Sequence, residues 1–218
     1  SGMYMASADE IYIVVRGKGG HAAMPELGID PILITSHIIV ALQQISSRNA
    51  NPAMPTVLSF GRFIADGQTN VIPSHIRIEG TLRTFDETWR REVHGLIKRI
   101  SSGTAEAMGG DCKFSIGHGY PFVNNDVDLT LRAQKEAVAY LGEDRVVELD
   151  IRMTGEDFSF YTQVIPGCFY RLGTRNEEKN ITAKLHTASF DIDTESLKTG
   201  MGLMAWLSLK ELLFLSGK

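Results

Sequence analysis

The order of hydrophobic periods in the first half of the chain most constrains its fold. Apolar residues recur at every second position, the period of a half-buried strand, in four segments: 9–15, 56–64, 74–84 and 112–116. In the third segment, Ile76, Ile78 and Leu82 share one face, and Arg77, Glu79 and Arg83 share the other. We therefore expect a sheet with one apolar face that another layer must cover.

Two helices are expected between these strands. Asp30 and Pro31 begin the first, which runs to about Arg48. Its face is predicted from near-helical spacing to be Ile32, Ser36, Ile39, Leu42, Gln43 and Ile45. Asp86 precedes the second helix, and Gly109-Gly110 ends it. The order strand-helix-strand-strand-helix-strand predicts a ferredoxin-like βαββαβ domain over residues 9–117, with both helices on one face.

Residues 118–218 show a different, incomplete α/β pattern. Helices are expected at 126–141, in TGEDFSFYTQV and from Glu195 onward, but only 146–150 and 168–173 read as strands. The last helix is apolar nearly all round, through Leu207, Leu209, Leu212, Leu213 and Phe214. Such a helix is buried on several sides. We therefore expect that part of this second domain's cover is missing from the chain.

The composition excludes several classes of protein. The 218 residues are 43% hydrophobic and 22% charged, with a net charge of −4, which is ordinary for a globular protein and offers no basic surface for nucleic acid. The most apolar stretch, Met201 to Leu215, is shorter than the roughly 20 residues of a membrane span. Cys112 and Cys168 lie far apart, and the N-terminus shows no secretory pattern, so a cytoplasmic location is expected.

Two histidines stand in unusual settings. The sequence has no Gly-x-Ser-x-Gly elbow and no phosphate-binding glycine loop, and its six histidines never sit at a chelating spacing. His21 follows Gly17, Gly19 and Gly20, which let the backbone come close to another surface. His186 lies on a polar loop before the last helix. Spacing alone favours a solvated loop for His21 and backbone hydrogen bonding for His186.

Asn70, Arg83 and the pair Glu156-Asp157 are further candidates. Asn70 lies between two strands and is suited to a substrate oxyanion, although Asn in a turn usually bonds its own backbone. Arg83 ends a strand with a guanidinium suited to grip a carboxylate, although such an Arg is often only solvated. For Glu156-Asp157 we favour a structural role, satisfying the amides at a helix N-terminus.

Six segments, each weak alone, are specific as an ordered set. They are GKGGHAAMP, DGQTNVIP, EGTLRTF, MTGEDFSFY, VIPGCFYRLGT and LHTASFDID. From about Met5 to Leu212, the chain resembles the C-terminal portion of the metal-dependent amidohydrolases that cleave N-acyl amino acids. This group of the aminoacylase/carboxypeptidase superfamily includes hippurate hydrolases and plant auxin-conjugate hydrolases.

The resemblance implies a role for each part of the chain. Residues 9–117 would be the lid or dimerisation domain, and 118–218 the returning part of a metallopeptidase-type catalytic domain. His21 would stabilise the tetrahedral oxyanion, in dimeric relatives at the partner's site, and Asn70 would bind the substrate nearby. Arg83 is the candidate for the substrate carboxylate, and His186 would match a metal ligand.

The chain also departs from this pattern. The family's other metal ligands and its general-base glutamate precede the lid and are absent here, so one imidazole remains of a site for two divalent ions, Zn²⁺ or Mn²⁺. A catalytic metal needs about three protein ligands. We therefore expect a homodimeric hydrolase of N-acyl amino acids or short peptides when complete, and an inactive chain in isolation.

A second interpretation belongs to another class. The chain would be a non-catalytic dimerisation or binding module derived from such an enzyme. The open edge of the predicted sheet supports this interpretation, because unpaired edge groups invite strand pairing.

Overall fold

The computed structural model describes residues 1–217, which form two compact units. The sheet unit comprises residues 3–123 and 151–163, and the helical unit comprises 1–2, 124–150 and the described residues from 164 onward. Each unit is described separately below.

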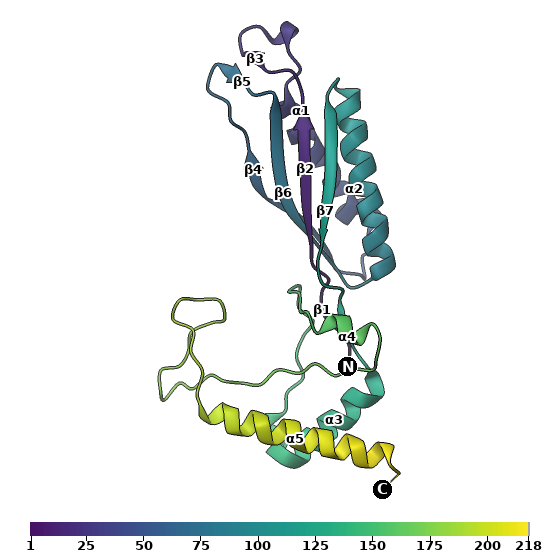
Figure 1. Cartoon of the computed structure of the whole chain (residues 1–218), viewed down its shortest axis with the longest axis vertical. Coiled ribbons are helices and arrows are strands. Elements are labelled where there is room, and N and C mark those ends of the chain that lie inside the picture. Colours follow the sequence, from purple (N-terminus) through teal and green to yellow (C-terminus); the bar gives the residue numbers. More distant parts are fainter. Residues whose placement is uncertain (218) are drawn as a thin grey trace. The chain divides into compact units, whose positions relative to one another are not determined.

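The sheet unit contains one four-stranded antiparallel sheet in the order β4-β6-β2-β7. The strands are β2 (Asp9–Arg16), β4 (Thr56–Ile64), β6 (His75–Thr84) and β7 (Asp111–His118). Helices α1 (Pro31–Gln44) and α2 (Glu87–Ala107) lie together on one face of this sheet (Figure 1). Strand order and layers are those of the ferredoxin-like βαββαβ fold, so the predicted fold class is confirmed.

Aspartates begin both helices, as the sequence predicts. The side chain of Asp30 accepts hydrogen bonds from the backbone amides of Ile32 and Leu33. Asp86 accepts in the same way from Thr88 and Trp89. Each carboxylate therefore satisfies two amides that a helix leaves without partners in its first turn. One π-helical turn, η2 (Ile45–Asn49), carries α1 to the predicted end near Arg48.

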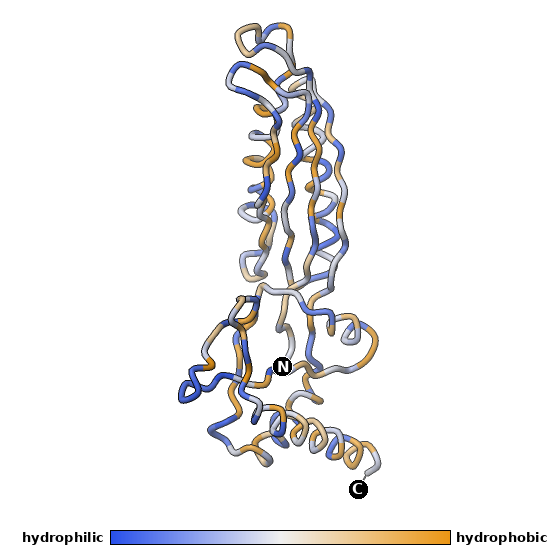
Figure 2. The backbone as a smooth tube through the Cα atoms, turned by 60° about the vertical axis from the view of Figure 1, so that its left-hand side comes forward, coloured by the Kyte–Doolittle hydropathy of each residue, from blue (hydrophilic) through white to orange (hydrophobic). Residues whose placement is uncertain are grey.

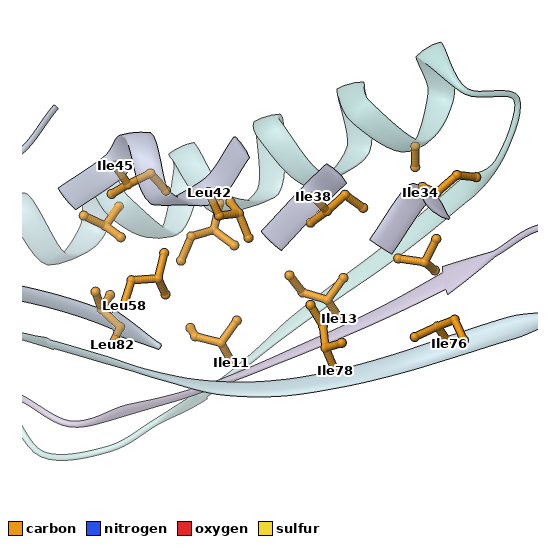
Figure 3. Packing of buried hydrophobic residues seen from close by; sticks show 14 residues of the cluster. Ile11, Ile13, Ile34, Ile38, Leu42, Ile45, Leu58, Ile76, Ile78 and Leu82 are labelled. Carbon is orange, nitrogen blue, oxygen red and sulfur yellow. The ribbon is translucent and has the colours of Figure 1, made fainter. Parts of the chain in front are cut away.

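The core lies between the sheet and the two helices (Figure 3). The predicted inward residues of β6, Ile76, Ile78 and Leu82, are all buried. The predicted face of α1 was wrong only in part. Leu42 and Ile45 are buried and Ile32 and Ile39 pack against the core, as predicted, but the structure also buries Ile34, Thr35 and Ile38. Ser36 and Gln43 instead bond carbonyls of their own helix on the exposed side. Since α1 carries isoleucine or leucine on every side, spacing alone does not identify its buried face.

A second, very short pairing lies beyond one end of the main sheet. Strand β3 (Gly20–His21) pairs antiparallel with β5 (Val71–Ile72), and a 3₁₀ turn, η1 (Pro25–Leu27), follows β3 (Figure 1). The sequence indicates only a loop and a connection in these places. Two residues on each side are too few to produce a recognisable alternation.

The helical unit is built around α3 (Val127–Leu141) and α5 (Glu195–Leu215), with a 3₁₀ turn, η3 (Glu143–Arg145), after α3. Arg132 on α3 makes a two-pronged ion pair with Glu211 on α5, at 3.0 and 2.5 Å. The indole Nε1 of Trp206 donates to the carbonyl of Glu136 at 3.1 Å. These contacts join the two helices side by side.

The strands predicted at 146–150 and 168–173 were wrong, because neither segment forms a strand in the described chain. The side chain of Asn125 bonds both the amide and the carbonyl of Phe169, at 2.7 and 2.9 Å. A side chain thus takes the place of a strand partner there. The remaining elements are β1 (Gly2–Met5), β8 (Val123–Asn125) and α4 (Ser159–Thr162).

Helix α5 exposes most of its apolar residues, and only Leu203 is buried. Figure 2 shows hydrophobic colour recurring along this helix. The exposed side chains are Leu197, Met201, Met204, Leu209, Leu212, Leu213, Phe214 and Leu215. The described chain therefore does not supply the cover that such a helix needs. Among the described residues, no helix combines the length and apolarity required to cross a bilayer.

Candidate active-site residues

His21 and Asn70 lie side by side at the β3–β5 pair. His21 is opposite Val71 in the register, and Asn70 directly precedes Val71. The amide of Ala22 donates to the carbonyl of Asn70 at 3.0 Å. Both candidate side chains are exposed. Residues 49 positions apart in the sequence are thus held at one tip of the sheet unit, which we call the His21 tip.

Gly19 makes the close approach of β3 to β5 possible. A Cβ on Gly19 would stand 2.5 Å from the carbonyl oxygen of Ile72 and 2.8 Å from the carbonyl carbon of Pro73. A Cβ on the neighbouring Gly20 would meet nothing within 4 Å. The close approach predicted from the glycine run is therefore confirmed, and it is specific to Gly19 within this pair of neighbours.

The two nitrogens of the His21 ring have different environments. The backbone amide of Ala23 donates to Nδ1 at 3.1 Å. A nitrogen that accepts a hydrogen bond carries no proton, so the neutral ring holds its proton on Nε2. The ring therefore offers an Nε2–H donor to any ligand that reaches the His21 tip.

Arg83 lies at the other end of the main sheet. In the register, His75 at the start of β6 pairs with Arg16 near the His21 tip, whereas Leu82 pairs with Asp9. Positions 75 and 83 are eight residue steps apart on this strand, or about 26 Å at the usual rise. Arg83 is half-buried, and its Nη1 lies 3.2 Å from where a Cβ on Gly155 would stand. The structure therefore does not bring Arg83 to His21 and Asn70.

His186 stands apart in the helical unit. It is exposed on the loop before α5, with a φ of 64° in the left-handed region. Among the described residues, the one group of three potential metal ligands does not include it. Because a catalytic metal needs about three protein ligands, His186 alone does not make up a metal site.

The predicted role of Glu156 and Asp157 was wrong in its detail. No side chain caps α4. The backbone carbonyls of Glu156 and Asp157 accept instead, from the amides of Ser159 at 3.2 Å and Phe160 at 3.0 Å. A helix of four residues has so few free amides that the preceding turn satisfies them.

A polar cluster at the Arg83 end of the sheet unit was missed by the sequence reasoning. The carboxylate of Asp9, whose side chain is 0% exposed, binds the guanidinium of Arg90 and lies 2.6 Å from Nε2 of His94. The amide of Gly119 donates to the same carboxylate at 3.1 Å. The ring of His118 packs edge to face on His94, with centroids 5.3 Å apart. The one local signal was the spacing of Arg90 and His94, four apart on one helix face.

Burial and hydrogen bonding oppose each other at Asp9. Burial alone would raise the pKa of this carboxyl, but hydrogen bonds from Arg90 and His94 and the charge of Arg90 outweigh it and hold the pKa well below its usual range. Asp9 is therefore ionised throughout the neutral range. It serves as the anchor of the cluster.

Comparisons with known proteins identify relatives over nearly the whole chain. Residues 7–107 match the family described as the peptidase dimerisation domain. An N-acetylcysteine deacetylase of Bacillus subtilis is 38% identical over 95% of this chain and 53% of its own length. An IAA-amino acid hydrolase, ILR1-like 5, of Arabidopsis thaliana is 34% identical over 97% of this chain and 50% of its own.

Solved structures agree with these relatives. The chain is similar to the Bacillus subtilis YXEP protein, described as a dinuclear metal binding peptidase from the M20 family, with a TM-score of 0.73 and 34% identity. That match covers 95% of this chain and 50% of the other. A structure described as a putative aminohydrolase of Staphylococcus aureus gives a TM-score of 0.78 at 27% identity, over 97% and 53% of the two chains. The chain spans about half the length of the curated relatives it matches.

Proposed function

The chain belongs to the M20 family of peptidases and amidohydrolases, and on that basis we propose that the complete protein hydrolyses the amide bond of N-acyl amino acids or short peptides. The observation that carries this proposal is the β3–β5 pairing, which holds His21 and Asn70 at one exposed tip. Residues 9–117 would serve as the lid and dimerisation domain. Residues 118–218 would form part of the catalytic domain.

In this proposal His21 and Asn70 stabilise the oxyanion of the tetrahedral intermediate. The Nε2–H of His21 donates to the oxygen on which negative charge develops, because Nδ1 is occupied by the amide of Ala23. The side-chain amide of Asn70 supplies a second donor from the neighbouring strand. Donors that are already in place when the charge develops lower the barrier to reaction.

The family's metal chemistry is only partly represented here. We propose two divalent ions, Zn²⁺ or Mn²⁺, in the complete enzyme, with His186 as one ligand. The residues of this chain do not make up that site, because His186 belongs to no group of three potential ligands in the described part of the chain. The isolated chain would therefore be inactive.

The distance between the His21 tip and Arg83 supports a homodimer. The part of β6 from His75, near the tip, to Arg83 is alone about 26 Å long, whereas a substrate of dipeptide size extends only about 7 Å. One substrate therefore does not touch both in the same chain. We propose that Arg83 binds the substrate carboxylate at a site whose oxyanion donors, His21 and Asn70, come from the other copy. We also propose that the enzyme is cytoplasmic.

A hydrolysis assay tests the function. The chain alone, and the chain mixed with a separately produced N-terminal half, are incubated with Mn²⁺ or Zn²⁺ and a panel of N-acetyl and N-benzoyl amino acids. We expect hydrolysis only in the mixture. Activity of the chain alone would contradict its proposed inactivity, and no activity even in the complete protein on acyl amino acids or dipeptides would contradict the hydrolase.

A non-catalytic dimerisation module is the second candidate. Strands β4 and β7 are both edges of the main sheet, so each has one side without a strand partner in the described chain. Sedimentation tests this candidate independently of catalysis. A dimer of the isolated chain without activity after the N-terminal half is added would favour the module, and a monomer at high concentration would count against dimerisation through this unit.

A further inference from the structure

We infer that Asp9, His94 and His118 form a binding site for one divalent transition-metal ion, of which Zn²⁺ is the best fit. The three residues come from β2, α2 and the end of β7, all within the sheet unit. Each offers one ligand atom, and the three atoms lie within 4.8 Å of one another. In the described chain, this is the only such group of three.

The spacing requires only a small adjustment to hold an ion. Ligands around a tetrahedral zinc at about 2.1 Å lie roughly 3.4 Å from one another. Nε2 of His94 and Oδ2 of Asp9 are already 2.6 Å apart and need to open slightly. His118 is exposed and its ring makes no hydrogen bond in the described chain, so only its edge-to-face contact with His94 has to adjust for the ring to move inward by up to about 1.4 Å.

The hydrogen bonds of Asp9 leave one place for a metal. Oδ1 accepts from Nη2 of Arg90 and from the amide of Gly119. Oδ2 accepts from Nε of Arg90 at 2.8 Å and from Nε2 of His94. An ion between Oδ2 and His94 would replace only the His94 proton. Arg90 and Gly119 would keep their bonds and orient the ligating carboxylate, as outer partners do in metal sites.

The local charge also permits a cation. Arg90 contacts a second carboxylate, that of Glu87, at 2.9 Å. Two carboxylates and one guanidinium sum to −1, and neutral histidines add nothing. Asp9 is fully buried, which favours pairing its charge with a partner in the site. The cationic Arg90 therefore does not leave a net positive charge that would repel the ion.

The ligand set selects the class of metal. Imidazole nitrogens suit Zn²⁺ and its neighbours in the first transition row, whereas Ca²⁺ and Mg²⁺ prefer oxygen ligands. Three protein ligands leave a fourth position for water. The ion would tie three elements together at this end of the sheet. Its binding would therefore stabilise the folded state.

Metal titration of the 218-residue chain tests the site. The chain is stripped with a chelator and titrated with Zn²⁺ by calorimetry and with Co²⁺ by visible absorption. We expect one ion per chain and a higher midpoint of thermal unfolding with Zn²⁺. His118→Ala should weaken binding about tenfold or more and abolish the thermal shift. Because His118 is exposed and its ring makes no hydrogen bond to any described residue, we expect this variant to keep the fold.

Two control variants sharpen the result. His37 is exposed on α1, away from the cluster, so His37→Ala should bind as the unaltered chain does. His186→Ala should also leave binding unchanged. Failure of the unaltered chain to bind one ion would overturn the inference. Unchanged metal binding by His118→Ala would overturn it as well. So would loss of metal binding by His186→Ala, if the other variants still bind the ion.

Discussion

The ring of His21 shows how a backbone amide prepares a side chain for one task. The amide of Ala23 occupies Nδ1, so the proton of the neutral ring faces outward on Nε2. A donor held in this way pays little reorganisation when charge develops on a substrate oxygen. The effect of removing it should therefore fall on turnover more than on substrate binding.

We expect His21→Ala, made in the complete enzyme, to lower kcat by about 10²–10³. KM should change little, because the lost hydrogen bond is strongest in the transition state. Steady-state kinetics on one N-acetyl amino acid measure both values. His37→Ala, an exposed histidine on α1, is the matched control. Turnover near that of the control would contradict the proposed role.

Asp9 is the second residue whose loss has a calculable effect. Asp9→Asn leaves the buried guanidinium of Arg90 without its main counter-charge, and breaking a buried pair costs about 3–5 kcal/mol. Urea unfolding at pH 7 measures the loss. In a Trp206→Phe background the remaining tryptophan is Trp89, so the fluorescence of that residue reports the unfolding of the sheet unit. A free energy of unfolding equal to that of the unaltered chain would be the contrary outcome.

The same residue predicts a pH dependence. Since the folded pKa of Asp9 lies below its unfolded value, its stabilising effect is complete above about pH 5 and is lost progressively as the pH falls further. The unaltered chain should therefore lose stability between pH 5 and about pH 2. Asp9→Asn should show a shallower loss over that range, and equal slopes in the two proteins would contradict the assignment.

At the scale of elements, the β3–β5 pair positions the candidate catalytic side chains with only two residues on each strand. Its closeness depends on Gly19, where a Cβ would stand 2.5 Å from the carbonyl of Ile72. Gly20 has open space around it. The β3–β5 pairing therefore depends on Gly19 and not on the adjacent Gly20.

Gly19→Ala should push β3 away from β5 and displace His21 relative to Asn70. A misplacement of about 1 Å can cost up to about 10²-fold in rate. We therefore expect a fall in kcat of roughly tenfold to a hundredfold, and faster hydrogen exchange at the amide of Ala22, which bonds Asn70. Gly20→Ala should change neither quantity. Equal effects of the two substitutions would contradict this account of the pair.

Elements with a local cause were predictable from the sequence, and elements that depend on distant partners were not. Asp30 and Asp86 marked both helix starts, because each carboxylate bonds amides two and three residues on. The β3–β5 pair joins segments about 50 residues apart, and nothing in either segment predicts the other. The segment 168–173 has strand-like residues, but the described chain holds no strand for it to pair with.

The residues of the candidate site were likewise predictable one by one, but their arrangement in space was not. Resemblance marked His21 and Asn70 separately, and their adjacency follows only from the pairing of distant loops. The Asp9 cluster escaped prediction because its members come from three elements spread over 110 residues. Convergence of this kind is set by the register of β2 against β7 rather than by any local spacing.

At the scale of the whole molecule, the separation of the His21 tip from Arg83 predicts a shared site. Complete enzyme carrying His21→Ala and complete enzyme carrying Arg83→Ala should each be nearly inactive. After co-refolding, half of the dimers are mixed, and each mixed dimer holds one intact site. We therefore expect recovery of about a quarter of the unaltered activity. No recovery would place both residues at a site within one copy and contradict the proposed exchange.

The four donor groups that converge on Asp9 also limit which substitutions this sequence can accept. Arg90 Nε and Nη2, His94 and the amide of Gly119 all depend on one carboxylate. Any replacement at position 9 leaves several of these donors without an acceptor at once, and no single compensating substitution restores all of the hydrogen bonds. In a library of single substitutions at every position, Asp9 should tolerate fewer replacements than the buried isoleucines of the same unit. Leucine or valine can replace such an isoleucine with only a modest loss of stability.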